Sequence, residues 1–307
     1  MIASNRVRSA PPIDSSRRSA HVWGIAYIMV GPGFLLMLLW IYGPAIYNFV
    51  LSLQSFQPGA PHVFVGFSNY AQIFSSGAFW DALGRTSEYL AIVPVMVILP
   101  LGMALLVNQK LPGMAIYRVI FFIPGMMSMV VVSILFSEIF QTQGLLNDLL
   151  VSLHITHTYL TWLGNPTLAI FFVMIVTVWA GQGQTMMFFL AALQAVEPEL
   201  YDAAKVDGAA FFRQVWSVTI PGIQLYLIYI IIGATTGALN IFTEIQIITS
   251  GGPLSATTTL SYYIYKEAFV NANFGYAAAL QEVHWMLMLV FTLVQFFYLG
   301  RKWVASS

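Results

Sequence analysis

The stretch EPELYDAAKVDGAAFFR, residues 197–213, holds six charged side chains in a chain of 307 residues of which only 8% are charged. Long segments with almost no charge lie on either side of it. The whole chain is 59% hydrophobic, with a mean hydropathy of +0.78, whereas a soluble domain is about 45–50% apolar and about 25% charged. The composition therefore predicts a membrane protein in which this stretch is a short charged connection.

The charge balance and the cysteine content exclude several classes of function. Lys and Arg together number 12, as do Asp and Glu, so the formal net charge is zero and nothing suggests a nucleic-acid partner. The chain has no cysteine, which excludes a disulfide framework, a thiolate metal site and a cysteine nucleophile. No cluster of acids, bases or metal ligands is visible in the sequence. We therefore expect neither catalytic nor metal-binding residues.

Six segments are long and apolar enough to cross a membrane as helices. The hydrocarbon layer is about 30 Å thick and a helix rises about 1.5 Å per residue, so a span needs roughly 20 mostly apolar residues. The sequence thus predicts an all-α integral membrane protein with six transmembrane helices and contacts to membrane lipid. The predicted spans cover about residues 22–49, 88–107, 120–140, 168–193, 223–248 and 283–299.

The distribution of Lys and Arg predicts the orientation, because cytoplasmic loops carry the excess of these residues. With six spans, ten of them fall on the side of the termini and two on the other side. Both termini are therefore expected in the cytoplasm, as is the connection at about 194–222. The expected organisation is a disordered tail at 1–21, a six-helix domain at 22–300 and a short tail at 301–307. The ten residues are Arg6, Arg8, Arg17, Arg18, Lys110, Arg118, Lys205, Arg213, Arg301 and Lys302, and the two are Arg85 and Lys266.

The first outer connection, about 50–87, is rich in aromatic residues. Because such rings favour the membrane–water interface, one interpretation is a helix that lies along the membrane surface. An ordinary loop packed on the helical bundle is an equally good interpretation. The aromatic residues concerned are Phe64, Phe67, Tyr70, Phe74, Phe79 and Trp80.

The charged connection predicts two short helices joined by a glycine turn. Pro198 between Glu197 and Glu199 is typical of a first helical turn, where carboxylates also favour the positive end of the helix dipole. Gly208 can adopt a positive φ angle and end the first helix. A second helical piece with an aromatic stripe follows, and Pro221 is expected to stop it before the fifth span. A solvated loop is the usual interpretation of such charges.

The spacing in this connection resembles the cytoplasmic signature of permease subunits of binding-protein-dependent ABC importers. In that family Glu-Ala-Ala is followed by three residues, Gly, nine residues and Ile-x-Leu-Pro. Here Asp202-Ala203-Ala204 is followed by three residues and Gly208, and nine more lead to Val218-Thr219-Ile220-Pro221. Asp202, Val218 and Ile220 replace the family's Glu, Ile and Leu, while every gap is kept.

The resemblance extends over nearly the whole chain and is greatest to the carbohydrate-type permeases of the maltose, glycerol-3-phosphate and oligosaccharide group. One departure is Arg85, where that group usually has Asn before Thr, and it places a positive charge near the predicted outer face. The similar elements are FVGFSNY at 64–70, YRVIFFIPGMMS at 117–128, TWLGNPTLAI at 161–170, VWAGQG at 178–183, TSGGP at 249–253 and AFVNANFGYAAAL at 268–280.

This resemblance implies a type I ABC importer permease in the prokaryotic cytoplasmic (inner) membrane. In the family the charged connection is the coupling helix: Asp202 would pair with a basic residue of a separate ATPase, and Ala203 and Ala204 would allow close approach. The implied partners are two cytoplasmic ATPase subunits, a second homologous permease and an extracytoplasmic solute-binding protein that delivers a sugar or sugar-like solute. The implied coupling residues are Glu199, Tyr201, Asp202, Ala203, Ala204, Asp207, Gly208, Ala209 and Pro221.

ATP and Mg²⁺ are expected on the partner ATPase, with no cofactor in this chain. A phosphate-binding loop of the Gly-Lys-[Ser/Thr] type needs Gly before Lys, and no lysine here follows a glycine. We therefore expect a non-catalytic transport subunit. The four lysines, Lys110, Lys205, Lys266 and Lys302, follow Gln109, Ala204, Tyr265 and Arg301.

Polar residues inside the predicted spans are candidates for contact with the solute, because such groups are costly in a membrane and often functional. Hydrogen bonding between helices, or a position at a water-exposed helix end, is an equally good alternative for them. The candidates are Gln182, Asn240, Glu244 and Phe242, whose ring could stack on a sugar.

An ion-gradient-driven secondary transporter is the alternative function. It would need a relay of ionisable residues at mid-membrane, such as Glu138, Glu244 and His284. Glu138 and His284 are expected near span ends, and His284 lies with Glu282 near the predicted outer interface. These positions argue against a relay.

Overall fold

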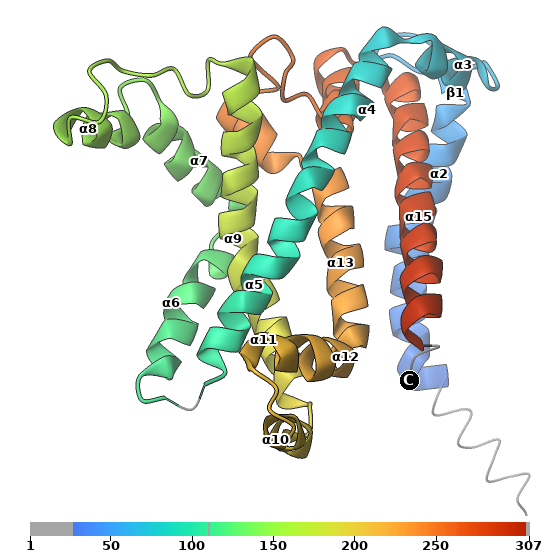
Figure 1. The fold of residues 1–307 in the computed structure, drawn as a ribbon. Coiled ribbons are helices and arrows are strands. Elements are labelled where there is room, and N and C mark those ends of the chain that lie inside the picture. Colours follow the sequence, from blue (N-terminus) through green and yellow to red (C-terminus); the bar gives the residue numbers. More distant parts are fainter. Residues whose placement is uncertain (1–26, 110, 305–307) are drawn as a thin grey trace, which may run out of the picture. The chain divides into compact units, whose positions relative to one another are not determined.

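The computed structural model describes residues 27–109 and 111–304 of the chain. These residues are mostly helical, as predicted (Figure 1). The tail expected at 1–21, the residue Lys110 and the last three residues lie outside the described part. The chain divides into two compact units, Met1–Leu51 and Ser52–Ser307.

The described part of the first unit is one apolar helix, which continues to Ser52. It runs over Tyr27–Ser52, 26 residues, and includes the π-helical turn η1 (Leu38–Tyr42) and α2 (Gly43–Ser52). Large apolar side chains are exposed all along it, and Trp40 exposes 76% of its surface. A helix that is apolar on all sides is expected in lipid or in a protein interior rather than in water. The helix confirms the first predicted span from Tyr27 onward.

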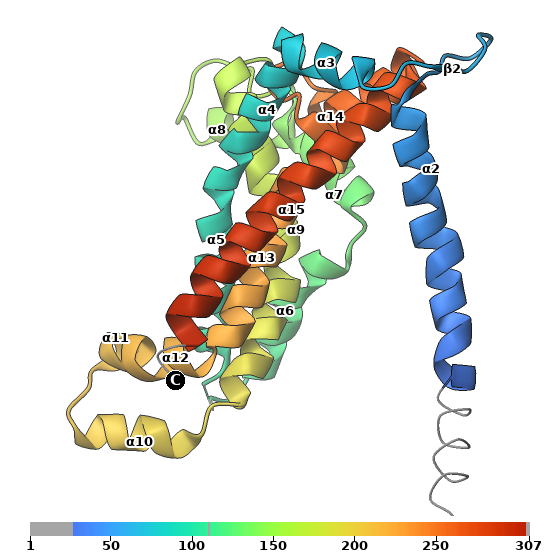
Figure 2. The ribbon, with the colours of Figure 1, turned by 90° about the vertical axis from the view of Figure 1, so that its right-hand side faces the viewer.

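The second unit begins at the end of the bundle opposite α10 (Pro198–Val206) (Figures 1 and 2). The strands β1 (Gln54–Ser55) and β2 (Val63–Phe64) pair antiparallel, and α3 (Ser68–Ser75) follows and packs on α15 (Phe274–Val304). Phe79 is buried here, whereas Phe64 and Phe67 each expose 73% of their surface. The aromatic connection is therefore packed on the bundle in one part and open in another.

Three long, continuous spans lie in the second unit. The first is continuous over Gly77–Val107, 31 residues, through α4 (Gly77–Tyr89), the 3-10 turn η2 (Leu90–Ile92) and α5 (Val93–Val107). The others are α9 (Pro166–Gln194) and α15. The first and the last begin well before the predicted starts at 88 and 283, because charged residues in α4 and α15 lower the local hydropathy without ending the helix.

Two predicted spans are broken. The segment predicted as 120–140 contains α6 (Met114–Met126) and α7 (Met129–Phe140), separated by the extended residues Met127 and Ser128, and α8 (Leu145–Ser152) follows. The segment predicted as 223–248 contains α13 (Gln224–Leu239) and the π-helical turn η4 (Ile245–Thr249), with an irregular link between them. Hydropathy does not reveal such breaks, because neighbouring groups satisfy the freed backbone atoms.

The number of spans agrees with the prediction of six when one bent pair is counted as a single span. Five helical segments in the described part are long and apolar enough to cross a membrane, and one of them, Met129–Ser152, comprises α7 and α8 and so lies later than the predicted span at 120–140. The sixth is the pair Phe211–Gly222 and Gln224–Leu239, which bends by 82°. Near the end of the bundle opposite α10, α14 (Leu260–Tyr265) and the π-helical turn η5 (Lys266–Val270) precede α15 (Figure 1).

The helices α6 and α9 approach closely because glycines face the contact. A methyl group built on Gly183 of α9 would collide with the carbonyl oxygen of Phe121, and one on Gly125 of α6 would lie 3.1 Å from the backbone nitrogen of Gln184. Small residues allow such close backbone contact between membrane helices. By contrast, nothing lies within 4 Å of a methyl group built on Gly181.

Gly183→Ala is expected to destabilise the fold, since a group forced into a packed contact costs about 1–3 kcal/mol. Gly181→Ala is the matched control, and a gain of up to about 1 kcal/mol in helix propensity is expected there. Each variant is heated in detergent and then run on a size-exclusion column. The measurement is the temperature at which its monodisperse elution peak is lost. A Gly183→Ala protein as stable as Gly181→Ala would show that the α6–α9 contact is looser than described.

Candidate functional site

The charged stretch forms the short helix α10, which lies at one end of the bundle beneath α11 (Phe211–Gln214) and α12 (Ile220–Gly222) (Figures 1 and 2). As predicted, Glu197 is the N-cap and Pro198 stands in the first turn. The helix ends at Val206 with Asp207 as the C-cap, and Gly208 follows with a φ angle of +74°. The amide of Gly208 donates to the carbonyl of Lys205 at 3.0 Å. The glycine turn is therefore confirmed.

The second helical piece ends one residue later than predicted. It runs through α11, the π-helical turn η3 (Val215–Thr219) and α12 to Gly222. Pro221 stands in the first turn of α12, where its missing N–H costs nothing, so it does not stop the helix itself. A methyl group on Gly222 would lie 2.9 Å from Val196. The chain thus turns into α13 at a position where it packs closely on the segment before α10.

Hydrogen bonds and apolar packing fix the inner side of α10. The hydroxyl groups of Tyr201 and Thr219 are 3.1 Å apart, and the Gln214 amide donates to the carbonyl of Ala209 at 2.7 Å. Thr219 is almost fully buried. Tyr201 also packs on a hydrophobic core that contains Leu193 and other residues of α9, α5 and α13. The inner side of α10 is therefore attached to the spans through Tyr201.

A cavity of about 240 Å³ separates α10 from the end of α5. Asn108 and Gln109 at the end of α5 line one side, and Tyr201, Lys205 and Gln214 line the other. This space leaves α10 attached through η3 and α11 rather than pressed against α5. The guanidinium group of Arg118 caps the same end of α5, with donors 3.1 and 2.8 Å from the carbonyl oxygen of Val107.

The outer side of α10 presents an apolar strip with charges beside it. Leu200 and Val206 expose 49% and 88% of their surface, and the small residue Ala203 lies between them on the exposed side. No residue of α10 is fully buried. Leu200, Ala203 and Val206, spaced three residues apart, thus give the outer side of α10 a narrow apolar strip.

Asp202 already has a partner within the chain. Its carboxylate accepts from the Lys205 ammonium at 2.9 Å, with side-chain exposures of 73% and 60%. The expectation that Asp202 is available for a basic residue of a partner is therefore incomplete. An exposed pair of this kind contributes only about 0–1 kcal/mol, so a partner could displace Lys205 at little cost.

The solute-contact candidates fall into two places. Glu244 is 6% exposed and accepts a hydrogen bond from Thr177 of α9 at 3.1 Å. Asn240 caps α13 and is exposed, and Phe242 packs between Tyr262 and Tyr265, with ring centroids 6.4 and 5.1 Å away. These three candidates surround the break after α13.

Gln182 stands apart from the other candidates. It is half-buried in a groove that α5 and α9 line together. The break after α13 and its contact to Thr177 were not predicted, because hydropathy in the segment 223–248 is continuous. The one sequence signal was Asn240 itself, since Asn is a poor residue for a helix interior.

The relay required by the ion-gradient alternative does not form among these residues. Glu138 is exposed on α7. His284 is not at an exposed interface as expected: it is 2% exposed, and its Nε2 donates to the carbonyl oxygen of Leu239 at 3.2 Å. The early start of α15 places His284 inside the helix, and the end of α13 leaves a carbonyl that needs a donor. Glu244 bonds Thr177 instead.

The part of the chain covered by residues 27–109 and 111–304 contains no group of three His, Asp or Glu side chains that could hold a metal ion. The contacts of α10 and its neighbours are those of packing and helix capping.

Comparison with known proteins gives consistent matches along the chain. A family model described as "Binding-protein-dependent transport system inner membrane component" matches residues 71–301. The probable ABC transporter permease protein YurN of Bacillus subtilis is 33% identical, with 91% of this chain and 97% of that protein covered. The lactose transport system permease protein LacF of Rhizobium radiobacter is 32% identical, with 88% and 92% covered.

A third relative and a solved structure agree with these matches. The trehalose/maltose transport system permease protein MalF of Thermococcus litoralis is 32% identical, with 88% of this chain and 92% of that protein covered. A chain in the crystal structure of a bacterial alginate ABC transporter with a pentasaccharide-bound periplasmic protein superposes with a TM-score of 0.81. It is 21% identical and covers 95% of this chain and 99% of its own length, which shows a common fold.

Proposed function

The chain belongs to the family of binding-protein-dependent transport system inner membrane components, and on that premise we propose that it couples sugar import to a separate ATPase through α10. It is a multi-pass permease subunit of an ABC importer with the type I fold, and it does not hydrolyse ATP itself. We further propose which residues couple the subunit to the ATPase, which end of the bundle faces the cytoplasm and which class of solute the subunit carries.

The observation that carries the proposal is the two-sided character of α10. Its inner side is fixed to the spans by the Tyr201–Thr219 contact of 3.1 Å, and its outer side leaves Val206 88% exposed. A partner that grips the outer side would therefore move the spans through the inner side. Ala203 and Ala204 keep the helix thin, and Gly208 and Ala209 set the turn to α11. Rigid-body movement of this kind is a common route between two states of a transporter.

The remaining coupling residues support docking in different ways. Glu199 stands in the first turn of α10, where its charge favours the helix dipole. Asp207 is the C-cap, and its amide donates to the carbonyl of Ala203 at 3.0 Å. Asp202 is proposed to exchange Lys205 for a basic residue of the ATPase, and Pro221 to hold the joint with α13.

The end of the bundle that carries α10 is proposed to face the cytoplasm, and both termini with it. Arg118, Lys205 and Arg213 all lie at this end within the described part of the chain, as the rule that cytoplasmic loops carry positive charge requires. We propose two ATPase subunits with bound ATP and Mg²⁺ on this side. A second, homologous permease would complete the pathway, and a solute-binding protein would deliver the solute on the opposite side.

The proposed solute is a sugar or a sugar-like molecule, because LacF and MalF are named for lactose and for trehalose and maltose. The test is ATP hydrolysis by the purified complex in proteoliposomes, with its solute-binding protein and each of a panel of sugars. We expect one or a few sugars to stimulate both hydrolysis and uptake. Uptake that follows an imposed proton or sodium gradient without ATP would instead favour the secondary transporter.

A further inference from the structure

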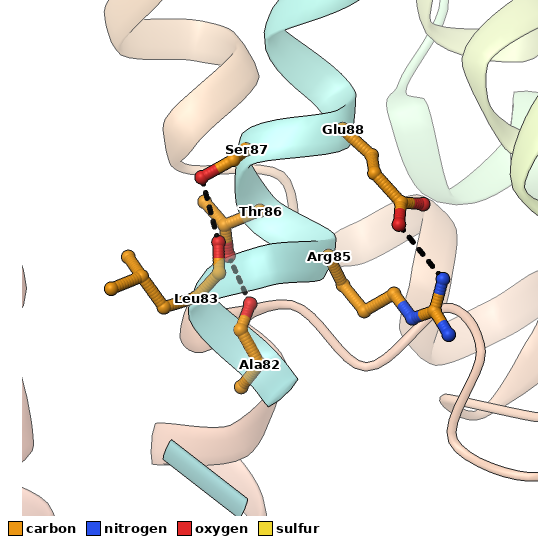
Figure 3. A network of polar contacts seen from close by, with 6 residues as sticks. All are labelled: Ala82, Leu83, Arg85, Thr86, Ser87 and Glu88. Carbon is orange, nitrogen blue, oxygen red and sulfur yellow. Dashed lines mark hydrogen bonds and ion pairs between the residues drawn. The ribbon is translucent and has the colours of Figure 1, made fainter. Parts of the chain in front are cut away.

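Two charged residues of α4 face a groove that the coupling mechanism does not use. Arg85 and Glu88 project from one side of the helix, away from Ser87 (Figure 3). They line a cavity of about 450 Å³ together with Thr167 and Phe171 of α9. Ligand sites commonly have volumes of about 300–1,000 Å³, so this cavity has room for a sugar unit.

The cavity continues along α9. A second hollow of about 430 Å³ shares Ala91, Phe171 and Met174 with the first and reaches Gln182. The two together form one groove, with the charged pair at one end, apolar walls in the middle and an amide at the other end. We call this the α4–α9 groove.

The orientation of α4 that produces this groove is fixed by Thr86. This residue is 1% exposed, and its Oγ1 donates to the carbonyl of Ala82 at 2.8 Å and accepts from the amide of Leu260 at 2.8 Å. The buried face of α4 is therefore bound to α14. Arg85 and Glu88 stand elsewhere on the helix surface and cannot turn into the core without breaking this contact.

The charged pair is only partly satisfied by its own ion pair. The Nη1 of Arg85 lies 2.8 Å from the Oε1 of Glu88, and the two side chains still expose 42% and 47% of their surface. A guanidinium group has five N–H donors and a carboxylate has about four acceptor positions, so most remain available. Exposed charges on a span are costly against lipid, which favours a groove lined by water and protein.

The electrostatics favour a neutral ligand over an anion. Arg85 and Glu88 cancel each other in charge. The amides at the start of α9, which would otherwise attract an anion, are occupied: those of Thr167 and Leu168 donate to the Asn165 side chain at 2.9 and 3.2 Å. What remains is a donor and an acceptor side by side, with an aromatic ring one helix away.

We propose that the α4–α9 groove binds a ring of a neutral sugar during transport. Arg85 donates to one hydroxyl group and Glu88 accepts from its neighbour, while Phe171, which exposes 55% of its surface, packs on the apolar C–H face of the ring. Gln182 offers a further polar contact at the far end of the groove. This inference rests on the proposed function as a sugar permease and names residues that contact the solute within it.

A thiol placed in the groove tests the proposal, because the chain has no cysteine of its own. Ala91→Cys places the thiol in the groove, and Ser87→Cys, on the other side of the same helix, is the matched control. Both are labelled with a membrane-impermeant thiol reagent in the assembled transporter, in right-side-out vesicles. Lactose, trehalose and maltose are the probes, because all three carry the neighbouring ring hydroxyl groups that Arg85 and Glu88 would contact.

We expect the thiol at position 91 to be labelled, and each sugar that the transporter takes up to slow its labelling several-fold without affecting position 87. Adding Glu88→Gln should raise the sugar concentration for half-protection by about tenfold, the usual effect of losing a hydrogen bond to a charged group. Glu138→Gln, at an exposed carboxylate on α7, should leave it unchanged. Labelling of Ala91→Cys without sugar shows whether Glu88→Gln has altered the groove itself.

Three results would overturn the site. The first is no labelling at position 91, which would mean that lipid or the second permease covers the groove. The second is labelling at position 91 that no sugar slows. The third is protection by sugar that Glu88→Gln leaves intact. Uptake by the unmodified transporter is measured in the same vesicles. Uptake of a sugar that gives no protection rejects the groove alone, whereas absence of ATP-driven uptake for every sugar of the full panel rejects the proposed function.

Discussion

Gly208→Pro is expected to abolish ATP-driven uptake while the permease still inserts into the membrane at its normal level. The φ angle of Gly208 is +74°, whereas proline fixes φ near −65°. Proline also removes the amide that donates to Lys205 at 3.0 Å. The turn between α10 and α11 must then open, and α10 loses its angle to the spans. The measurement is initial uptake of the identified solute, normalised to the amount of permease in the membrane.

Gly208→Asn is the matched control for this change. Asn tolerates a positive φ better than other residues with side chains, and the left-handed conformation costs an ordinary residue about 1–2 kcal/mol. We expect Gly208→Asn to keep a substantial part of the uptake. Full uptake by Gly208→Pro would show that the turn is not needed for coupling.

Val206→Glu is expected to release the ATPase subunits from the complex. Val206 is 88% exposed, so its replacement leaves the fold of the free permease unchanged. In a closed interface the new carboxylate would be buried without a partner, which costs about 2–5 kcal/mol and weakens binding by about thirty-fold to several thousand-fold. The measurement is the amount of ATPase that co-purifies with the permease, together with uptake.

Gln194→Glu adds the same charge at an exposed position at the end of α9, outside α10. It should leave both co-purification and uptake near normal, which controls for the added charge itself. Equal losses in the two variants would indicate a general charge effect. Normal co-purification of the ATPase with Val206→Glu would place the contact elsewhere on the chain.

The helix α10 could be predicted because its signals are local. Pro198 stands in a first turn and Gly208 at a left-handed end, and both act through their own backbone angles. The same reasoning failed at Pro221, because its effect depends on whether a new helical turn starts there. The packing of Gly222 on Val196 decides that, and it is a tertiary contact.

The breaks after α6 and α13 could not be predicted for the same reason. A break in an apolar helix is tolerated only where other groups satisfy the freed backbone atoms. At the end of α13 the carbonyl oxygen of Leu239 accepts a hydrogen bond from His284 of α15. Beyond the break, Glu244 accepts a hydrogen bond from Thr177 of α9. These partners are distant in sequence. Asn240, Phe242 and Glu244 were therefore identified as residues but not as the surroundings of a break.

The groove proposed for the sugar was likewise predictable only in part, because most of its residues are brought together by tertiary contacts. Gln182 was predicted from its polarity inside a span, but Arg85 was seen only as a departure from the related permeases. Its pairing with Glu88 at 2.8 Å lies within α4, and its place in one groove with Phe171 follows from the packing of α5, the continuation of this span, on α9. Thr86, which orients α4, gives no sign of this role in the sequence.

The central claim, that α10 is the contact to the ATPase, is tested most directly by photo-crosslinking. A photoreactive amino acid at position 206 is compared with one at position 254. Leu254 is 92% exposed and lies in the connection between η4 and α14, and α14 is near the end of the bundle opposite α10 (Figure 2). In the assembled transporter we expect an adduct with the mass of the permease plus one ATPase subunit from position 206 and none from position 254. No ATPase adduct from position 206, or an ATPase adduct from position 254 alone, would contradict the account.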